Sequence, residues 1–290
     1  MIWYLLTAIA ILWTSFATIS DIKTREVSDW LNYSLIAIGF GVRFIYSLVY
    51  NEWIYLWYGF IGFVAFFMIA NLMYYAKQWG GGDAKLLMGY GVVFGNYPTD
   101  LLNYFSPNLN TPFLAILIIN LILFGGVYAL IYSISLAIKN RKKFLLEFRK
   151  LSTGVDFKLK RNFSLFLMLV IIIISLLFDD FKIKLLIYWL ALFVLIFLYL
   201  TLFVKSIENI SMFKSINTNK LTEGDWVIKP ILFKGKVIYM PERLGITKKN
   251  IEMLKRLKIK NILIKEGLPF VPSFLIALII SLIFGNVIIL

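Results

Sequence analysis

Two aspartates are the strongest candidates for chemistry in this sequence, because each lies where an apolar segment meets a polar one. Asp21 follows the first apolar segment in the run SDIKTREVSDW, and Asp83 follows three glycines in the run KQWGGGDAKLL. The chain contains no histidine and no cysteine, so metal sites and nucleophiles that depend on imidazole or thiolate groups are excluded. Any chemistry must therefore come from carboxylates, hydroxyls, amines or the backbone, and the two aspartates lead us to expect a carboxylate pair with no metal and no cofactor.

A pair of carboxylates can hydrolyse a peptide bond without a covalent intermediate. Two carboxyl groups placed close together cannot both ionise, because their negative charges repel, so the pair shares one proton. The ionised carboxylate then takes a proton from water, while the protonated one polarises the peptide carbonyl. Asp21 and Asp83 are suitable partners for this reaction if the fold brings them together.

The glycine run before Asp83 predicts an unusual backbone. Gly80, Gly81 and Gly82 lose conformational entropy on ordering, so we expect them where the backbone needs positive φ or a close approach. Such a loop would leave the Asp83 carboxyl open to an extended peptide. The phosphate-binding spacing GxxxxGK[ST] is absent. The structural alternative is that Asp83 is the N-cap of the following helix.

The elements around these aspartates are predicted to be membrane helices. Of the 290 residues, 60% are hydrophobic and 16% charged, against about 25% charged in an ordinary globular protein. Apolar stretches close to the length that crosses a bilayer predict about eight spans. They cover residues 1–19, 31–50, 53–76, 84–102, 112–138, 163–178, 185–204 and 268–290.

The distribution of basic residues predicts the orientation of the chain. All Lys and Arg residues except Arg43, Lys182 and Lys184 lie in or beside the loops that follow spans one, three, five and seven. These loops are therefore expected in the cytoplasm, with Asp21 and Asp83 at the same membrane depth. The basicity is explained by topology and anionic lipid, so we expect no nucleic acid partner. For Arg43, we expect the stem to reach the outer interface.

The predicted fold class is an all-α polytopic membrane protein with a small cytoplasmic α/β domain. A catalytic membrane core at 1–138 is followed by a basic amphipathic loop at 139–162, where a helix is expected on the membrane surface. Two further membrane helices follow at 163–204. The α/β domain, at 205–267, is expected to contain strands at 225–229, 231–240 and 261–265 and a helix capped by Thr247. The last membrane helix covers 268–290.

Together, the two aspartate motifs resemble those of the GxGD membrane aspartyl peptidases, specifically the archaeal prepilin and preflagellin peptidases of the type IV prepilin peptidase family. The runs LTEGDWVI at 221–228 and GLPFVPSF at 267–274 also look like the archaeal branch. The resemblance implies that Asp21 and Asp83 are the catalytic pair. The residues that match the two motifs are Asp21, Lys23, Arg25, Gly80, Gly81, Gly82, Asp83 and Lys85.

The resemblance also implies the substrate class. It is the class III signal peptide of prepilins or preflagellins, a short cationic leader before a hydrophobic helix, cut at the cytoplasmic membrane face. We expect Glu26 and Asp29 to attract the leader, although Asp29 could instead cap the second span. Lys85 could steady the charge of Asp83 or bind lipid phosphate. The oligomeric state and the choice between pilins and archaellins stay open.

Two departures and three alternatives accompany this interpretation. Bacterial relatives carry a paired CxxC module and a methyltransferase activity, so a chain without cysteine is expected to be a peptidase only. Smaller archaeal relatives have about six spans, so the helices at 163–204 resemble an insertion. The alternative functions are a proton- or cation-coupled transporter, a non-enzymatic surface-filament assembly protein, and a presenilin-like protease with both aspartates within the hydrocarbon.

Overall fold

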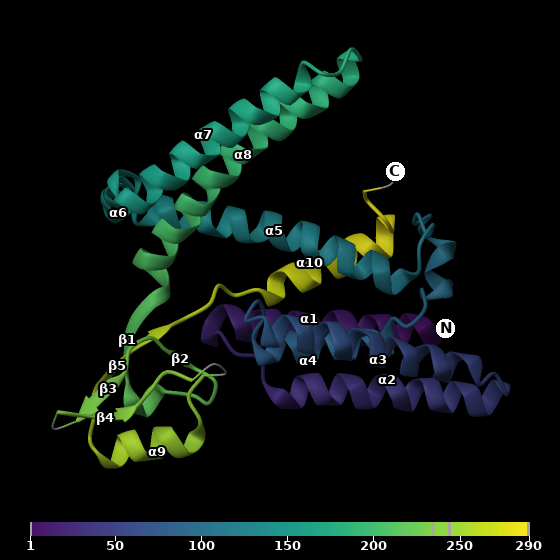
Figure 1. Ribbon diagram of the computed structural model, residues 1–290. Helices are drawn as coiled ribbons and strands as arrows, with labels where there is room; N and C mark the ends of the chain where they lie inside the picture. The colour runs from purple at the N-terminus through teal and green to yellow at the C-terminus, as the bar shows by residue number, and fades with distance from the viewer. Residues whose placement is uncertain (1, 234, 243–244, 289–290) are drawn as a thin grey trace. The chain divides into compact units, whose positions relative to one another are not determined.

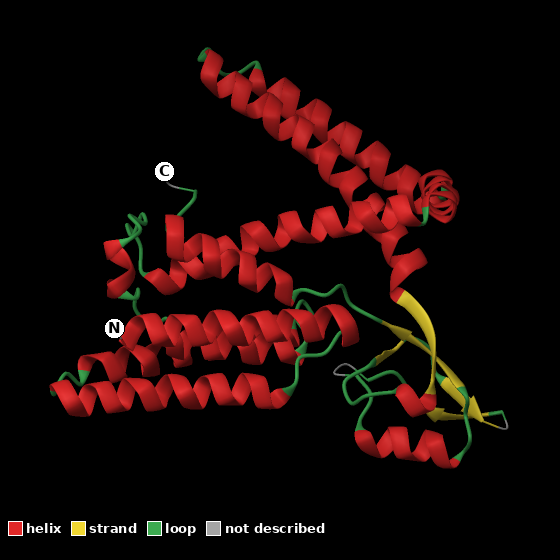
Figure 2. Cartoon of the chain, turned by 180° about the vertical axis from the view of Figure 1, so that it is seen from behind, coloured by secondary structure: helices red, strands yellow, loops and turns green. Residues whose placement is uncertain are grey.

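A computed structural model describes residues 2–233, 235–242 and 245–288 (Figure 1). The chain divides into two compact units, one formed by residues up to Leu130 together with those from Gly267 on, the other by Ile131–Glu266. Most of the described residues are helical, and the strands are confined to the second unit (Figure 2). The predicted fold class, a polytopic helical membrane protein with a small α/β domain, is confirmed.

The first unit is a helical bundle in which α4 contacts α1, α2 and α3, and α10 packs on α1 (Figure 1). Its apolar core takes side chains from every one of these helices and from α5, whose last turns belong to the second unit. The helices are α1 (Ile2–Thr24), α2 (Asp29–Tyr50), α3 (Ile54–Tyr75), α4 (Gly81–Val93), α5 (Phe113–Lys139) and α10 (Val271–Phe284).

Within the described residues, five helices are long and apolar enough to cross a membrane: α1, α2, α3, α5 and the helix Phe181–Met212. The helices α4 and α10 have 13 and 14 residues, fewer than the roughly 20 that a straight span needs. The predicted fourth span at 84–102 is wrong at its end, because α4 stops at Val93. A short 3₁₀ turn, η1 (Thr99–Asn103), follows Pro98.

The helices α3 and α4 pack with their backbones in contact. A Cβ atom added to Gly62 would lie 2.1 Å from the carbonyl oxygen of Gly91, and one added to Gly91 would lie 2.3 Å from that of Gly62. Glycine pairs of this kind let helices approach closely where lipid supplies no hydrophobic driving force for association. The glycine-rich sequence of α4 is therefore explained by its packing.

Arg43 shows why α4 ends where it does. Its side chain is fully buried in the bundle. Nε donates to the carbonyl oxygen of Val92 at 2.7 Å, and Nη2 donates to that of Val93 at 2.9 Å. Further bonds reach the Asn96 side chain at 2.9 Å and the Tyr55 carbonyl at 2.6 Å. The expectation that Arg43 reaches the outer interface is wrong, because its guanidinium serves the unpaired carbonyls at the C-terminus of α4.

The second unit begins with α6 (Arg141–Thr153), α7 (Val155–Ser175), α8 (Phe181–Ile207) and the π-helical turn η2 (Glu208–Met212). The helix α7 starts inside the predicted loop at 139–162. An amphipathic helix is present at α6, and its Phe144 ring lies 5.5 Å from the Phe203 ring of α8. Part of the apolar face of α6 is therefore covered by the protein itself.

The remainder of the second unit is the α/β domain. Its strands are β1 (Phe213–Asn217), β2 (Trp226–Val227), β3 (Ile231–Phe233), β4 (Lys236–Tyr239) and β5 (Asn261–Lys265), and its helix is α9 (Lys248–Arg256). An antiparallel sheet has the order β1-β5-β2, and β3 pairs with β4. Thr247 caps α9 as predicted, with Oγ1 accepting from the Asn250 N–H at 3.4 Å. The strand β1 was not predicted.

Candidate active site

Asp21 lies in the last turns of α1, which continues to Thr24, beyond the predicted span end at residue 19. Its side chain is buried, with 6% of the residue exposed. One carboxylate oxygen, Oδ2, accepts a hydrogen bond from the Val271 N–H at 2.9 Å. Val271 is the first residue of α10, whose N-cap Phe270 has no side chain able to accept this bond. Asp21 therefore caps α10 from another helix.

The segment between α1 and α2 is held by a turn at Arg25 and by hydrogen bonds to backbone carbonyl groups. Arg25 adopts positive φ, at 61°. The carbonyl oxygen of Glu26 accepts bonds from the Ser20 hydroxyl at 2.8 Å and from the Thr24 hydroxyl at 3.3 Å. The Arg25 guanidinium lies at hydrogen-bond distance, 3.5 Å, from the Gly267 carbonyl oxygen. These bonds set the end of α1, where Asp21 is held, while Lys23 and Glu26 are exposed.

Asp83 is the third residue of α4, and the N-cap position is taken by Gly80. The carboxylate oxygen Oδ2 of Asp83 accepts from the Gly80 N–H at 3.0 Å. The expected alternative that Asp83 is itself the N-cap is therefore wrong by three positions. Asp83 supplies the half of a capping box that reaches back to the N-cap backbone. Gly80 has no side chain to supply the other half.

Positive φ does not explain why the three residues before Asp83 are glycines. The φ angle of Gly80 is −71°, and neither Gly81 nor Gly82 is among the residues with positive φ. The expected close approach occurs at Gly82, where an added Cβ would lie 3.0 Å from the Cβ of Val27. The start of α4 is thus packed directly against the link between α1 and α2.

The electrostatics of Asp83 are those expected of a carboxyl pair. Asp83 lies outside the five long apolar helices. Burial and the nearby charge of Asp21 raise the pKa of Asp83 to about 7, although the Gly80 N–H bond acts to lower it. The fold therefore brings the two sequence-predicted aspartates close enough to interact. The described residues hold no group of three or more acidic side chains that could bind a metal ion.

Lys85 and Asp29 interact with each other, and the interaction that the structure shows for Lys85 is not with Asp83. Lys85 forms an ion pair with Asp29, and its Nζ lies 5.3 Å from the centre of the Tyr33 ring. Asp29 is the first residue of α2, and its preceding N-cap, Ser28, makes no side-chain capping bond. A negative charge at this position also favours the helix dipole. Glu26 and Asp29 are both exposed.

Asn32 is a residue near the site that the sequence analysis did not identify. It is fully buried in α2, and its Nδ2 donates to the Gly82 carbonyl oxygen at 3.3 Å. A polar amide near the start of an apolar span was the available signal. The run SDIKTREVSDW ends at Trp30, two residues before this amide, so Asn32 lies just outside the motif.

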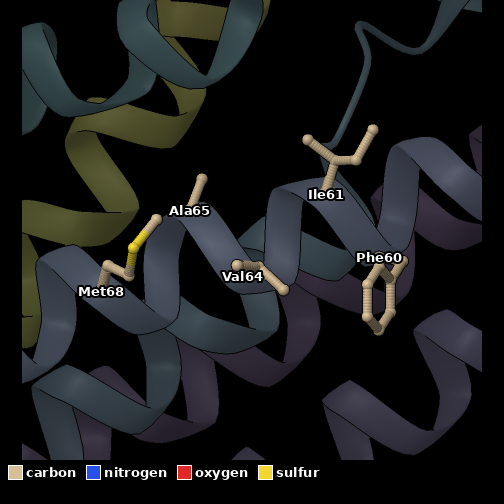
Figure 3. A pocket seen from close by; sticks show the side chains of 5 residues that line it. All are labelled: Phe60, Ile61, Val64, Ala65 and Met68. Carbon is tan, nitrogen blue, oxygen red and sulfur yellow. The ribbon is translucent and has the colours of Figure 1, made fainter.

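A shallow hollow on the face of α3 offers no comparable chemistry (Figure 3). The side chains that line it are all apolar, and none of them titrates. They are Phe60, Ile61, Val64, Ala65 and Met68. The aspartates at the ends of α1 and α4 are therefore the better candidate for a reactive centre.

The fold and the site define a multi-pass membrane protein with two acidic side chains at helix ends, one of which affects the pKa of the other. Residues 8–134, which include both aspartates, match the type IV leader peptidase family. The resemblance to prepilin and preflagellin peptidases that the two motifs carry is confirmed.

Two curated relatives carry the name preflagellin peptidase. The one from Methanocaldococcus jannaschii is 31% identical over 97 residues, which are 33% of this chain and 40% of the relative. The one from Methanococcus voltae is 29% identical over 160 residues, which are 55% of this chain and 64% of the relative. The chain thus matches less than two thirds of the length of either relative. No solved structure matches it.

Proposed function

We propose that this protein is a membrane aspartyl endopeptidase that removes the short cationic leader of archaeal prepilins or preflagellins at the cytoplasmic membrane face. The observation that carries the proposal is the raised pKa of Asp83, which results first from its burial and second from the nearby charge of Asp21 on a different helix. Both lie in the segment that matches the leader peptidase family, and the relatives' names supply the substrate class.

The reaction uses one proton shared by the two carboxyl groups. The ionised carboxylate accepts a proton from water as the water oxygen bonds to the peptide carbonyl carbon, and the protonated carboxyl gives its proton to the carbonyl oxygen. The C–N bond of the tetrahedral intermediate then breaks: the nitrogen takes a proton from the pair, and one hydroxyl group of the intermediate gives its proton to the pair as the carbonyl re-forms. The pair regains its single proton, and the products are a carboxylic acid and an amine.

Backbone N–H groups hold the two carboxylates in place for these steps. Val271 donates to Asp21, and Gly80 donates to Asp83. These N–H groups lie at the N-terminal ends of two helices, so they keep their orientation during the reaction. The entropy cost of orienting the carboxylates is therefore incurred during folding and not in the catalytic step. The substrate's hydrophobic helix would remain in lipid while its leader reaches the exposed side of the pair.

The exposed acids near the site are proposed to attract the leader. Glu26 is exposed, and Asp29 is exposed although it pairs with Lys85. A leader Lys or Arg would compete with Lys85 for Asp29. Partly exposed ion pairs are weak enough for such an exchange.

The test is cleavage of a peptide containing a cationic leader and the following hydrophobic helix by the purified protein in lipid vesicles. Wild type is compared with Asp21→Asn and Asp83→Asn, which keep an oxygen able to accept the backbone N–H. We expect cleavage by wild type and a loss of at least about 1,000-fold in each variant, in line with removal of a catalytic acid or base. Near-wild-type cleavage by either folded variant would contradict the two-aspartate mechanism.

A further inference from the structure

Asn32 occupies an unusual place for an amide. It lies within the apolar helix α2 and is fully buried. Its Nδ2 donates to the Gly82 carbonyl oxygen at 3.3 Å, whereas its Oδ1 is buried with no hydrogen-bond partner among the described residues. Burying a polar group with only part of its hydrogen bonds made costs free energy. Asn32 therefore does not serve stability in the way that an apolar residue at the same position would.

The position of the carbonyl group that accepts the Asn32 hydrogen bond indicates the role of Asn32. The Gly82 carbonyl belongs to the peptide group that joins Gly82 to Asp83, so a donor on this oxygen fixes the plane from which the Asp83 backbone continues. The other side of Gly82 is closed by Val27, which a Cβ on Gly82 would approach at 3.0 Å. The peptide group before Asp83 is thus held from two directions.

The same end of α2 contacts the next turn of α4. Asp29 and Tyr33, which lie beside Asn32 on the helix, both contact Lys85. Lys85 and Asp29 are partly exposed, so their pair is screened by solvent. Asn32 is the buried member of these three contacts.

We propose that Asn32 is a positioning residue that holds the Gly82–Asp83 peptide group, and through it the Asp83 carboxyl, in the geometry that reacts with Asp21. The inference rests on the proposed peptidase function. Since small misplacements of a reacting group lower rates steeply, loss of the Asn32 amide should lower kcat by about 10- to 100-fold. The value of KM should change little, because Asn32 is buried away from the leader.

The structure supplies a matched control. Asn120 of α5 is also fully buried and leaves its own Oδ1 without a partner in the described structure. Its Nδ2 donates to the backbone carbonyl of Gly285 at 2.8 Å and also to the Ser281 hydroxyl at 2.8 Å, so its replacement removes one hydrogen bond more than that of Asn32. Asn120 also differs in bonding the C-terminal end of α10 and not the start of α4. Asn32→Leu and Asn120→Leu therefore make the same chemical change at equal burial.

Both variants are assayed with the leader peptide in vesicles for kcat, KM and the pH profile, beside the thermal midpoint of each protein. We expect Asn32→Leu to lose at least 10-fold in kcat relative to Asn120→Leu and to shift the basic limb of its pH profile downward as Asp83 becomes less enclosed. Asn32→Ala replaces Asn32→Leu if the larger side chain prevents folding.

Equal kcat values and equal pH profiles for the Asn32 and Asn120 variants would overturn the inference while leaving the peptidase function intact. Absence of cleavage by wild type would instead overturn the function on which the inference rests.

Discussion

The two ends of α4 are held by the same face of α2 but are built for different purposes. Asn32 bonds the first turn of α4 and Arg43 bonds its last turn. Eleven positions is about three helical turns, so both side chains project from one face of α2. Between them, Leu35 and Gly39 of that face pack against Gly89 and Val92 of α4. One helix thus supports α4 along its whole length.

The two ends of α4 differ in how completely their polar groups are hydrogen-bonded and neutralised. At the C-terminal end, Arg43 makes four hydrogen bonds and meets the partial negative charge of the helix end. At the N-terminal end, Asp83 has a raised pKa, and the Asn32 Oδ1 has no hydrogen-bond partner within the described part of the chain. Fully hydrogen-bonded buried polar groups stabilise a fold, whereas a buried carboxyl group with a raised pKa is typical of functional sites. The C-terminal end of α4 therefore fixes the helix, and the N-terminal end is proposed to react.

The largest predicted effect on stability is at Arg43. Arg43→Met should lower the free energy of unfolding by about 3 kcal/mol, because several buried carbonyl groups lose their donor. Thermal unfolding in detergent measures this loss. The folded fraction should keep the wild-type pH profile for cleavage, since the change lies at the end of α4 that has no reactive group. A shifted pH profile would show that the two ends are not separate in function.

Whereas Arg43 is predicted to stabilise the fold, the ionised carboxylate of Asp83 is predicted to destabilise it. Its pKa in the folded protein, about 7, exceeds the ordinary value of 3.8, so the folded state binds the proton more tightly than the unfolded state does. Wild-type stability should therefore fall as pH rises from about 4 to about 7 and level off above that range.

Asp83→Asn removes this dependence. The variant should be nearly as stable as wild type at pH 4 and more stable at pH 8. The full pKa shift corresponds to about 4 kcal/mol, and because the Asp83 residue is partly exposed, solvent screening should reduce the difference to about 2 kcal/mol. Thermal midpoints at the two pH values measure the difference, with Asp179→Asn, a change at an exposed aspartate, as control. An Asp83→Asn protein less stable than wild type at pH 8 would show that the carboxylate is not destabilising.

A smaller effect is expected from the capping role of Asp21. Asp21→Ala removes the acceptor of the Val271 N–H and should cost about 1 kcal/mol of stability. Asp21→Asn keeps an acceptor oxygen and should cost much less, although both variants are expected to be inactive in cleavage. Thermal midpoints of the two proteins distinguish these outcomes, and equal midpoints would mean that the cap on α10 has no energetic value.

The smallest effect is expected at the partly exposed ion pair. Lys85→Met should change stability by about 0.5 kcal/mol or less and should leave kcat within a few-fold of wild type. Its effect should decrease further in high salt, because solvent ions screen the pair. A loss of kcat as large as that of Asn32→Leu would mean that Lys85 acts on Asp83 directly.

Local patterns predicted the parts of the molecule that depend on local sequence. The aspartate motifs, the strand β5 and the Thr247 cap are all written in runs of a few residues. The strand β1 escaped prediction because its sequence FKSIN shows no clear alternation of apolar and polar residues. The sequence also placed Asp21 and Asp83 at one membrane depth, which made their meeting predictable from topology.

The contacts that orient the site could not be predicted in this way. Asp21 meets a residue 250 positions away, and Asn32 and Arg43 meet acceptors 50 and 49 positions away. In all three bonds the partner is a backbone group. Because almost every residue type carries the same backbone groups, the partner residue cannot be recognised from its side chain. The expectation for Arg43 was wrong for the same reason, because the early end of α4 is set by tertiary packing.

The measurement that tests the central claim most directly is the pH dependence of kcat/KM for cleavage of the leader peptide, which reports the titration of groups in the free enzyme. A pair that shares one proton, with the pKa of Asp83 near 7, predicts a rate that falls as pH rises above about 7, when the pair loses that proton. A rate that stays constant or increases from pH 6 to about 9 would contradict a reactive carboxyl pair at the start of α4.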